Sequence, residues 1–391
     1  MNSQWNNLSF ECCPQFTKLV IKSGQQKDTS TPSASFHDHS SRKYLNRPSA
    51  NKAMDVNLSH QFIPLFATVF IIVWIVMPHW IKRAQKAGLM GKDIHKNSDQ
   101  PVAEMGGIVV LLGFLIGIMG YVAMRIFMFK TNSDIVSILA ILTAVLIAGV
   151  IGIIDDILGW KIGLRQWQKP LLTLLVAAPI MAINAGTRTM MLPFLGQTNL
   201  GMIYPLIIIP ILIVVSTNGF NMLAGYNGLE TGMGIIILTT LAYLAATTGS
   251  PWIAVVALCM VAALMGMFVF NKYPSSVFPG DTLTYTVGAL IGIMAITANL
   301  EKIFIILFIP YILEFFLKLR GRFQKESFAQ IQEDGTLKPR YAKNYGLEHL
   351  AVRLLNKLRI KTNERKVVYL LYGFQLCFVV IAIFNIRGLL R

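Results

Sequence analysis

Charged residues are scarce in this 391-residue chain: Asp, Glu, Lys and Arg together make up 14%, whereas 54% of the residues are hydrophobic. Soluble domains carry about 25% charged residues, so the composition excludes a water-soluble fold. Cysteine is also scarce, with four residues and no spacing typical of a disulfide framework or a zinc site. The N-terminal residues 1–56 contain no apolar run that resembles a secretory signal peptide. The sequence contains instead a series of long, uncharged hydrophobic segments.

These hydrophobic segments are suited to crossing a lipid bilayer. A hydrocarbon core of about 30 Å requires roughly 20 apolar residues per helix. The candidate spans are 61–81, 106–128, 134–154, 170–184, 202–217, 229–248, 251–270, 282–299, 303–318 and 367–386, the fourth and fifth being short. The expected fold class is therefore an all-α polytopic membrane protein of about ten transmembrane helices.

Basic residues are distributed unevenly among the loops. The net charge of +16 would suit a nucleic-acid partner, but Lys and Arg concentrate in the loops after odd-numbered spans, above all the ninth. Positively charged loops stay in the cytoplasm. We therefore expect these loops inside, both termini outside, and no nucleic-acid partner. In a prokaryote the membrane would be the cell membrane.

The N-terminal tail, residues 1–56, is set apart by its composition. It is rich in Ser, Asn, Gln and Lys, which is typical of disorder. Met54 stands just before the first span, so a later translation start would leave most of this tail out of the mature protein. The expected membrane domain is 57–391.

Polar residues recur at the cytoplasmic ends of the spans. Ionisable and amide side chains are costly near a membrane interior, so such residues are candidates for function. The first group follows span one and comprises Lys92, Asp93, Ile94 and then Glu104. An ordinary cytoplasmic loop is an equally good explanation for each of them.

The adjacent carboxylates Asp155 and Asp156, at the expected end of span three, give the sharpest local signal. Two close carboxylates repel each other, and at a helix C-terminus they also face the unfavourable end of the helix dipole. A bound cation or a nearby basic residue such as Lys169 would compensate them. The alternative is a solvated helix end.

Asn221 and Asn227 lie in the run Asn-Met-Leu-Ala-Gly-Tyr-Asn-Gly-Leu-Glu, which would interrupt a transmembrane helix. Irregular backbone survives in a membrane only where protein or a water-filled cavity satisfies it. Amide oxygens can coordinate Mg²⁺ or read a nucleobase. An interhelical network of Asn side chains is the alternative.

Asp281 stands at the start of span eight, directly after Phe278-Pro279-Gly280. A carboxylate at this position commonly caps the helix. The other interpretation is a magnesium site of the phosphoryl-transfer kind, formed with the polar residues at the ends of spans three and five.

Arg320 and Arg322 follow span nine. Basic residues just cytoplasmic of a helix commonly set topology or meet anionic lipid. Arg also binds phosphate well through its bidentate donors, so the alternative is a clamp on a substrate phosphate.

Taken in order, these segments resemble the polyprenyl-phosphate N-acetylhexosamine-1-phosphate transferases, and the resemblance covers about residues 57–390. The runs Asn221 to Glu230 and Phe278 to Thr282 are similar to the archaeal and eukaryotic UDP-GlcNAc:dolichyl-phosphate branch. Bacterial relatives usually carry Asp in place of Ala224.

The resemblance implies a reaction and its partners. UDP-GlcNAc, or a related UDP-HexNAc, would donate its sugar phosphate to dolichyl or polyprenyl phosphate and release UMP, as the first step of lipid-linked glycan assembly for protein N-glycosylation. The resemblance further implies ten transmembrane helices, a cytoplasmic active site, an Mg²⁺ or Mn²⁺ cofactor and a homodimer.

The resemblance also implies residue roles. The implied catalytic residues are Asp155, Asp156 and Lys169; the metal ligands are Asn221 and Asp281; the substrate-binding residues are Lys92, Asp93, Ile94, Glu104, Asn227, Phe278, Arg320 and Arg322. Eukaryotic members have Arg-His-Arg where this chain has Arg320-Gly321-Arg322, which removes a contact to the N-acetyl sugar.

Two rival functions are a secondary transporter and an inactive assembly partner. A transporter would place charged sites near the bilayer centre and show internal repeats, whereas here the carboxylates stand at span ends and no convincing repeat is found. An inactive partner is disfavoured because the implied catalytic and metal-binding residues are all present.

Overall fold

The computed structural model describes residues 60–94, 101–192 and 196–389. These residues belong to the structural unit 53–391. The tail expected at 1–56 lies outside the described residues, and its boundary stays a prediction.

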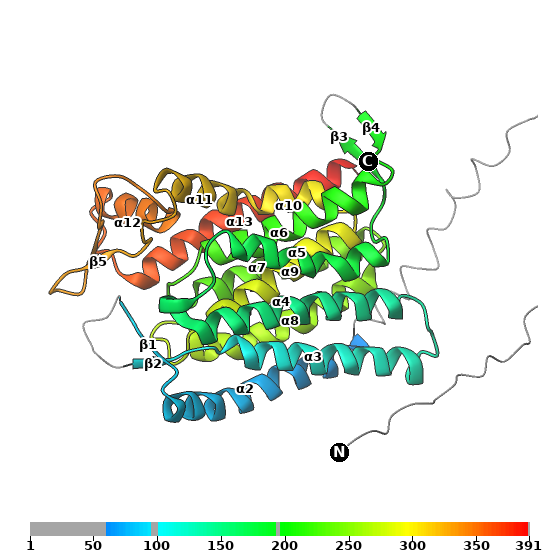
Figure 1. The fold of residues 1–391 in the computed structure, drawn as a ribbon, viewed down its shortest axis with the longest axis horizontal. Helices are drawn as coiled ribbons and strands as arrows, with labels where there is room; N and C mark the ends of the chain where they lie inside the picture. The colour runs from blue at the N-terminus through cyan, green and yellow to red at the C-terminus, as the bar shows by residue number, and fades with distance from the viewer. Residues whose placement is uncertain (1–59, 95–100, 193–195, 390–391) are drawn as a thin grey trace, which may run out of the picture. The chain divides into compact units, whose positions relative to one another are not determined.

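The described part of the chain is largely α-helical (Figure 1). In chain order the helices are α2 (Ile63–Ala87), α3 (Gly107–Ala123), α4 (Ile135–Ile162), α5 (Gln168–Ala182), α6 (Ile209–Met222), α7 (Leu229–Thr247), α8 (Pro251–Asn271), α9 (Gly280–Thr297), α10 (Glu301–Leu307), α11 (Ile309–Arg320), α12 (Leu347–Lys357) and α13 (Glu364–Leu389). Short π-helical stretches, Met124–Met128 and Tyr204–Ile208, continue α3 and precede α6.

Within the described ranges, the strands form three small antiparallel pairs outside the helices. They are β1 (Met90–Lys92) with β2 (Pro101–Ala103), β3 (Thr189–Leu192) with β4 (Gly196–Asn199), and β5 (Gln330–Ile331) with β6 (Leu337–Lys338). In β1–β2, Met90 faces Ala103 and Lys92 faces Pro101.

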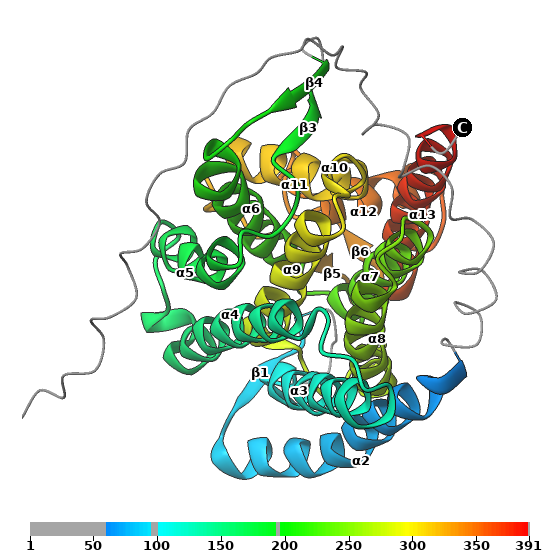
Figure 2. The same cartoon turned by 90° about the vertical axis from the view of Figure 1, so that its right-hand side faces the viewer.

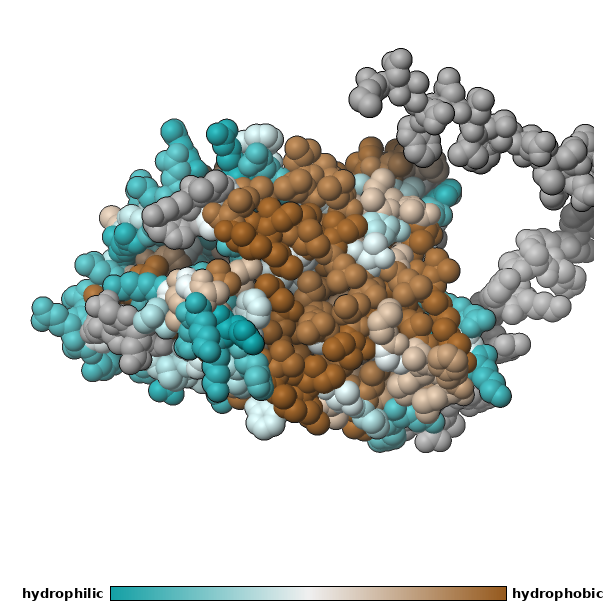
Figure 3. Space-filling view, turned by 60° about the horizontal axis from the view of Figure 1, so that its bottom comes forward, coloured by the Kyte–Doolittle hydropathy of each residue, from teal (hydrophilic) through white to brown (hydrophobic). Residues whose placement is uncertain are grey.

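Eight helical segments in the described part of the chain are long and apolar enough to cross a membrane. Large apolar side chains on their outer surface, such as Trp74 and Ile75, are about half exposed. On the face drawn in Figure 3, a broad apolar region is flanked on two sides by hydrophilic residues. A surface of this kind needs a bilayer around it, so the chain is a polytopic membrane protein.

Two of the ten expected spans differ from the other eight. The segment expected at 170–184 is α5, which has only 15 residues and contains Pro179. The segment expected at 303–318 is divided into α10 and α11 at Pro310, because proline lacks an amide hydrogen and clashes with the preceding helical turn. The count of ten crossings and the outside location of both termini stay predictions.

Helix α9 lies within the bundle, surrounded by other helices (Figure 2), and it is the most buried of the candidate spans. α4 and α6 pack directly on it. Glycines permit this approach: a Cβ at Gly152 of α4 would lie 2.5 Å from Cα of Thr282, and a Cβ at Gly288 of α9 would lie 2.7 Å from the carbonyl oxygen of Ser216. Small residues often allow such close packing between membrane helices. The ends of α4, α6 and α9 that carry the polar motifs are thereby brought together.

Candidate active site

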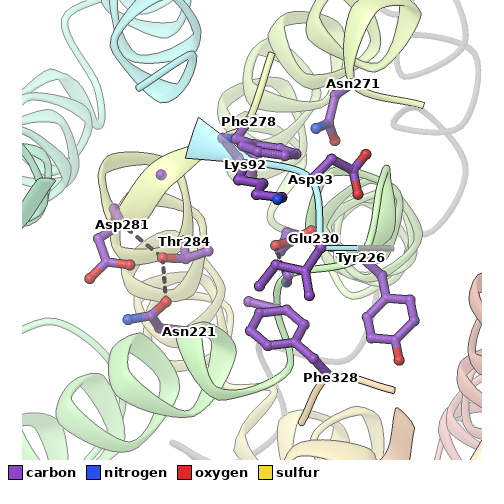
Figure 4. Close-up of a pocket in the computed structure, with 15 residues that line it drawn as sticks. Lys92, Asp93, Asn221, Tyr226, Glu230, Asn271, Phe278, Asp281, Thr284 and Phe328 are labelled. Carbon is purple, nitrogen blue, oxygen red and sulfur yellow. Dashed lines mark hydrogen bonds between the residues drawn. The ribbon is translucent and has the colours of Figure 1, made fainter. Parts of the chain in front are cut away.

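A cavity of about 300 Å³ lies at this end of the bundle. Of the residues expected in the site, those that line it are Lys92, Asp93, Ile94, Asn221, Phe278 and Asp281. Figure 4 shows Asp281, Thr284 and Asn221 grouped on one side of the cavity, with Lys92, Asp93 and Phe278 farther along it. The cavity thus has an acid and amide end, formed by Asp281 and Asn221, and a separate aromatic wall at Phe278.

Backbone hydrogen bonds fix Phe278 at the cavity wall. Its N–H donates to the carbonyl oxygen of Ala103 in β2 at 2.7 Å, and its own carbonyl oxygen accepts from Gly106 at 2.9 Å. The N–H of Gly107, at the start of α3, donates to the carbonyl oxygen of Pro279 at 2.8 Å. The loop before α9 is therefore held by the segment that connects β2 to α3.

Asp156 holds the N-terminus of α9. Its carboxylate accepts hydrogen bonds from the backbone N–H groups of Asp281 (2.7 Å) and Thr282 (3.0 Å) and from the Thr282 hydroxyl (2.6 Å). The N-cap position of α9 is Pro279, which makes no side-chain capping bond, and Asp281 lies in the first turn after it. The interpretation of Asp281 as a helix cap is therefore wrong, because Asp156 satisfies the free N–H groups at the start of α9. The Asp281 carboxylate is left to face the cavity.

Lys169, in the first turn of α5, joins two of the carboxylates. Its Nζ lies 2.5 Å from Oδ2 of Asp155 and 3.0 Å from Oδ2 of Asp281. Asp155 is buried and also accepts a hydrogen bond from the backbone N–H of Leu164 at 2.9 Å. One ammonium between two carboxylates leaves a net negative charge, which would favour a bound cation.

The aspartates do not stand at a solvated helix end. α4 continues beyond them to Ile162, with a kink at Gly159 where φ is 63°. Asp155 and Asp156 therefore lie within the helix and contact α5 and α9, and the helix continues past residue 154, the expected end of span three.

Asn221 and Asp281 fit an Mg²⁺ ion by the chemistry of their oxygen atoms. Both line the cavity, and the Thr284 hydroxyl lies between them, 3.0 Å from Oδ1 of Asn221 and 3.2 Å from the carbonyl oxygen of Asp281. Among the described residues, no group of three or more His, Cys, Asp or Glu side chains is arranged to hold a metal ion. Mg²⁺ commonly uses one or two protein oxygens together with substrate phosphates and water, so substrate would complete such a site.

Asn227 lies behind the cavity wall and is not among the cavity-lining residues. Its side-chain amide donates to Oδ2 of Asp93 at 2.9 Å and to Oε2 of Glu364 at 3.3 Å. Its backbone N–H donates to Oε1 of Glu364 at 2.7 Å. Asn227 therefore orients Asp93, which does line the cavity, while its direct contact with a base stays a prediction.

Besides Asn227, three of the expected substrate-binding residues are also not among those that line the cavity. Glu104 lies beside Gly91 of β1, and burial together with the negative charge of Asp156 raises its pKa. Arg320, at the end of α11, and Arg322, just after it, are exposed. Their roles in substrate binding stay predictions.

Several cavity residues were not assigned roles from the sequence. They are Tyr226, Glu230, Asn271, Thr284 and Phe328, among others. Glu230 accepts a hydrogen bond from the backbone N–H of Gly225 at 2.6 Å, so the Asn-rich loop folds back onto α7. Phe328 comes from the polar segment after α11 and packs where a Cβ at Gly225 would lie, 2.6 Å from its ring. In the sequence, Gly225 and Glu230 were noted as members of the Asn-rich run, whereas Phe328 gave no signal.

Comparison with known proteins identifies the family of this chain. Residues 138–299 match glycosyl transferase family 4. Relatives from Saccharolobus solfataricus (35% identity over 325 residues, 82% of this chain and 94% of that protein) and Sulfolobus acidocaldarius (31% over 324 residues, 82% and 95%) are provisionally named UDP-N-acetylglucosamine–dolichyl-phosphate N-acetylglucosaminephosphotransferases. A phospho-N-acetylmuramoyl-pentapeptide-transferase of Clostridium beijerinckii is 32% identical over 264 residues, 64% of this chain and 76% of that protein. The resemblance found in the sequence is confirmed, and the chain belongs to glycosyl transferase family 4.

Proposed function

We propose that this protein transfers GlcNAc-1-phosphate from UDP-GlcNAc to dolichyl or polyprenyl phosphate and releases UMP, as the first step of lipid-linked glycan assembly for N-glycosylation. The two relatives that it matches over most of its length are named for this transfer. The reaction joins a water-soluble nucleotide sugar to a lipid. Its site therefore has to be reached from water and from the membrane.

An apolar groove of about 280 Å³, formed by α5, α6 and α11, suits the chain of the lipid substrate. Val215 and Phe316 contribute to its wall and are 46% and 59% exposed, so the groove is accessible from the surface of the bundle. An apolar wall open to the bilayer can accept an isoprenoid chain without any ionisable group being desolvated.

The junction between this groove and the cavity carries the proposal. At the end of α6, Met222 lines the groove and Asn221 lines the cavity. At the start of α5, Pro170 lines the groove, while the preceding residue, Lys169, contacts Asp281 of the cavity. The phosphate of a lipid in the groove would thus reach Lys169, beside the acid and amide end of the cavity.

The chemistry requires two anions to meet. An oxygen of the lipid phosphate attacks the β-phosphorus of UDP-GlcNAc, and the bond from that phosphorus to the bridging oxygen breaks, so that the oxygen leaves with UMP. Lys169 supplies positive charge where the two phosphates approach, and Asp156 keeps Asp281 in position. Mg²⁺ held by Asn221 and Asp281 would neutralise charge on the pyrophosphate. Phe278 offers a ring for stacking against uracil.

We place this chemistry at the cytoplasmic face of the membrane. The distribution of Lys and Arg supports this orientation, because the loops at the cavity end of the bundle include the strongly basic segment after α11. A homodimer stays a prediction.

The direct test incubates the purified protein, in liposomes, with UDP-GlcNAc, dolichyl phosphate and Mg²⁺ and identifies the nucleotide released. UMP together with lipid-pyrophosphoryl GlcNAc is expected, and chelation with EDTA should stop the reaction until Mg²⁺ or Mn²⁺ is restored. Release of UDP would indicate ordinary glycosyl transfer. No product from any UDP-hexosamine would overturn the proposal.

A further inference from the structure

A second pocket, of about 250 Å³, lies against the same loop as the candidate active site. The loop is 223–228: Ala224, Gly225 and Tyr226 line the active-site cavity, whereas Asn227 lines the second pocket. The remaining walls come from the end of α8 and the first turns of α13. The loop therefore separates the two hollows.

The second pocket is positively charged. Lys272 and Arg365 line it, both are exposed, and neither forms a salt bridge with any residue that the structure describes. The guanidinium of Arg365 lies 5.1 Å from the centre of the Tyr273 ring, a cation–π distance that holds it at the pocket. Two cations beside tyrosine side chains favour an anionic ligand.

The pocket lies at the level of a membrane boundary. The span Pro251–Asn271 ends one residue before Lys272, and the span Glu364–Ile386 begins one residue before Arg365. Tyr369, about one turn into the latter span, lines the pocket and is 63% exposed. Tyrosine is typical of the membrane–water interface, and basic pockets between spans on the cytoplasmic side bind lipid headgroups.

We propose that this pocket binds the phosphate headgroup of an anionic bilayer lipid and thereby stabilises the wall of the active site. Binding at Arg365 would fix the first turn of α13, where Glu364 accepts two of the three hydrogen bonds that Asn227 donates. Tyr372, in the next turns, lines the pocket and donates from its hydroxyl to the carbonyl oxygen of Gly228 at 2.5 Å. Because Asn227 also donates to Asp93, fixing Asn227 would in turn hold Asp93 in place in the active-site cavity.

The binding test is independent of any reaction. Native mass spectrometry of the purified protein, with added phosphatidylglycerol or phosphatidylcholine, counts the lipids that stay bound. We expect one tightly held phosphatidylglycerol, bound about 25-fold more weakly by the double variant Lys272→Gln/Arg365→Gln, since each basic residue near an anionic membrane surface contributes about fivefold. Lys357→Gln/Arg359→Gln, which removes the same charge near the end of α12, should bind like the wild type.

Three outcomes would overturn the proposal. The first two are equal retention of phosphatidylglycerol and phosphatidylcholine, and an equal loss of phosphatidylglycerol binding in both double variants. The third is displacement of phosphatidylglycerol by 10 mM inorganic phosphate, which would assign the pocket to a soluble anion.

The effect on the active site rests on the proposed function and is measured separately, in nanodiscs. Anionic lipid should lower the KM for UDP-GlcNAc in the wild type and not in the pocket variant, with kcat little changed. If no UMP is released in nanodiscs of any lipid composition, the proposed transferase function is refuted, while the lipid binding measured by mass spectrometry is unaffected. UMP release with a KM for UDP-GlcNAc that does not depend on lipid charge would refute the coupling between the pocket and the active site.

Discussion

At the scale of single residues, the two neighbouring aspartates of α4 have different surroundings. Asp155 pairs with Lys169, whereas Asp156 accepts three hydrogen bonds from the start of α9. Asp281 contacts Lys169 and faces the cavity. By these contacts Asp156 holds the start of α9, while Asp155 and Asp281 meet at Lys169; the catalytic role of Asp156 stays a prediction.

This difference predicts unequal effects of two conservative substitutions. Asp156→Asn places an NH₂ group against N–H donors and should lower the free energy of unfolding by about 2 kcal/mol, the scale of a charge-assisted hydrogen bond. Asp281→Asn should unfold like the wild type but release UMP about 100-fold more slowly, because it loses charge at the proposed metal site. Thermal unfolding in detergent and UMP release measure the two effects. An Asp156→Asn variant with the unfolding temperature of the wild type, or an Asp281→Asn variant with wild-type activity, would contradict these two roles.

Glu104 predicts a dependence of stability on pH. Burial and the charge of Asp156 raise its pKa above the ordinary value of 4.5, so the folded state favours the protonated form. The stability contributed by Glu104 is therefore present below pH 4.5 and is lost as the pH rises through the raised pKa. Glu104→Gln should be more stable than the wild type near neutral pH, with a flatter profile of unfolding temperature from pH 4.5 to 7. The exposed Glu333→Gln is the control, and parallel profiles for the wild type and Glu104→Gln would refute the prediction.

At the scale of elements, the site depends on how closely α4 approaches α9. A methyl group at Gly152 would lie 2.5 Å from Cα of Thr282, which is backbone and cannot move aside. Gly152→Ala should therefore push α4 away, lower the unfolding temperature and reduce UMP release at least tenfold, since catalysis depends on precise positioning. Gly373→Ala in α13 is the matched control, because no heavy atom lies within 4 Å of its added Cβ. A similar response from both variants would mean that the helix contact does not position the site.

At the scale of the whole molecule, the cavity and the groove divide the two substrates between water and membrane. Val215→Trp narrows the groove and should raise the KM for dolichyl phosphate several-fold, while the KM for UDP-GlcNAc stays unchanged. Ile211→Trp, one turn earlier on α6 and 55% exposed, is the control outside the groove. Initial rates with each substrate varied in turn give both constants. An unchanged KM for the lipid, or a rise in both constants, would remove the groove from the proposal.

The sequence by itself determined the membrane class and the family of this protein. Both follow from local information: the length of uncharged runs identifies the spans, and the spacing of residues such as Asp155 and Asp156 within short motifs carries the resemblance. Helix interruptions were harder to place, because Pro310 acts on a segment that is otherwise apolar enough to be one span.

Only the tertiary structure decided which polar groups contact one another. The bonds from α9 to Asp156, the position of Asn227 behind Asp93, the entry of Phe328 into the cavity and the second pocket at Lys272 all join residues far apart in the chain. A hydropathy or motif pattern records the type and local spacing of residues. Which donor meets which carboxylate is set instead by the packing of α4, α6 and α9, where glycine allows the backbones to touch.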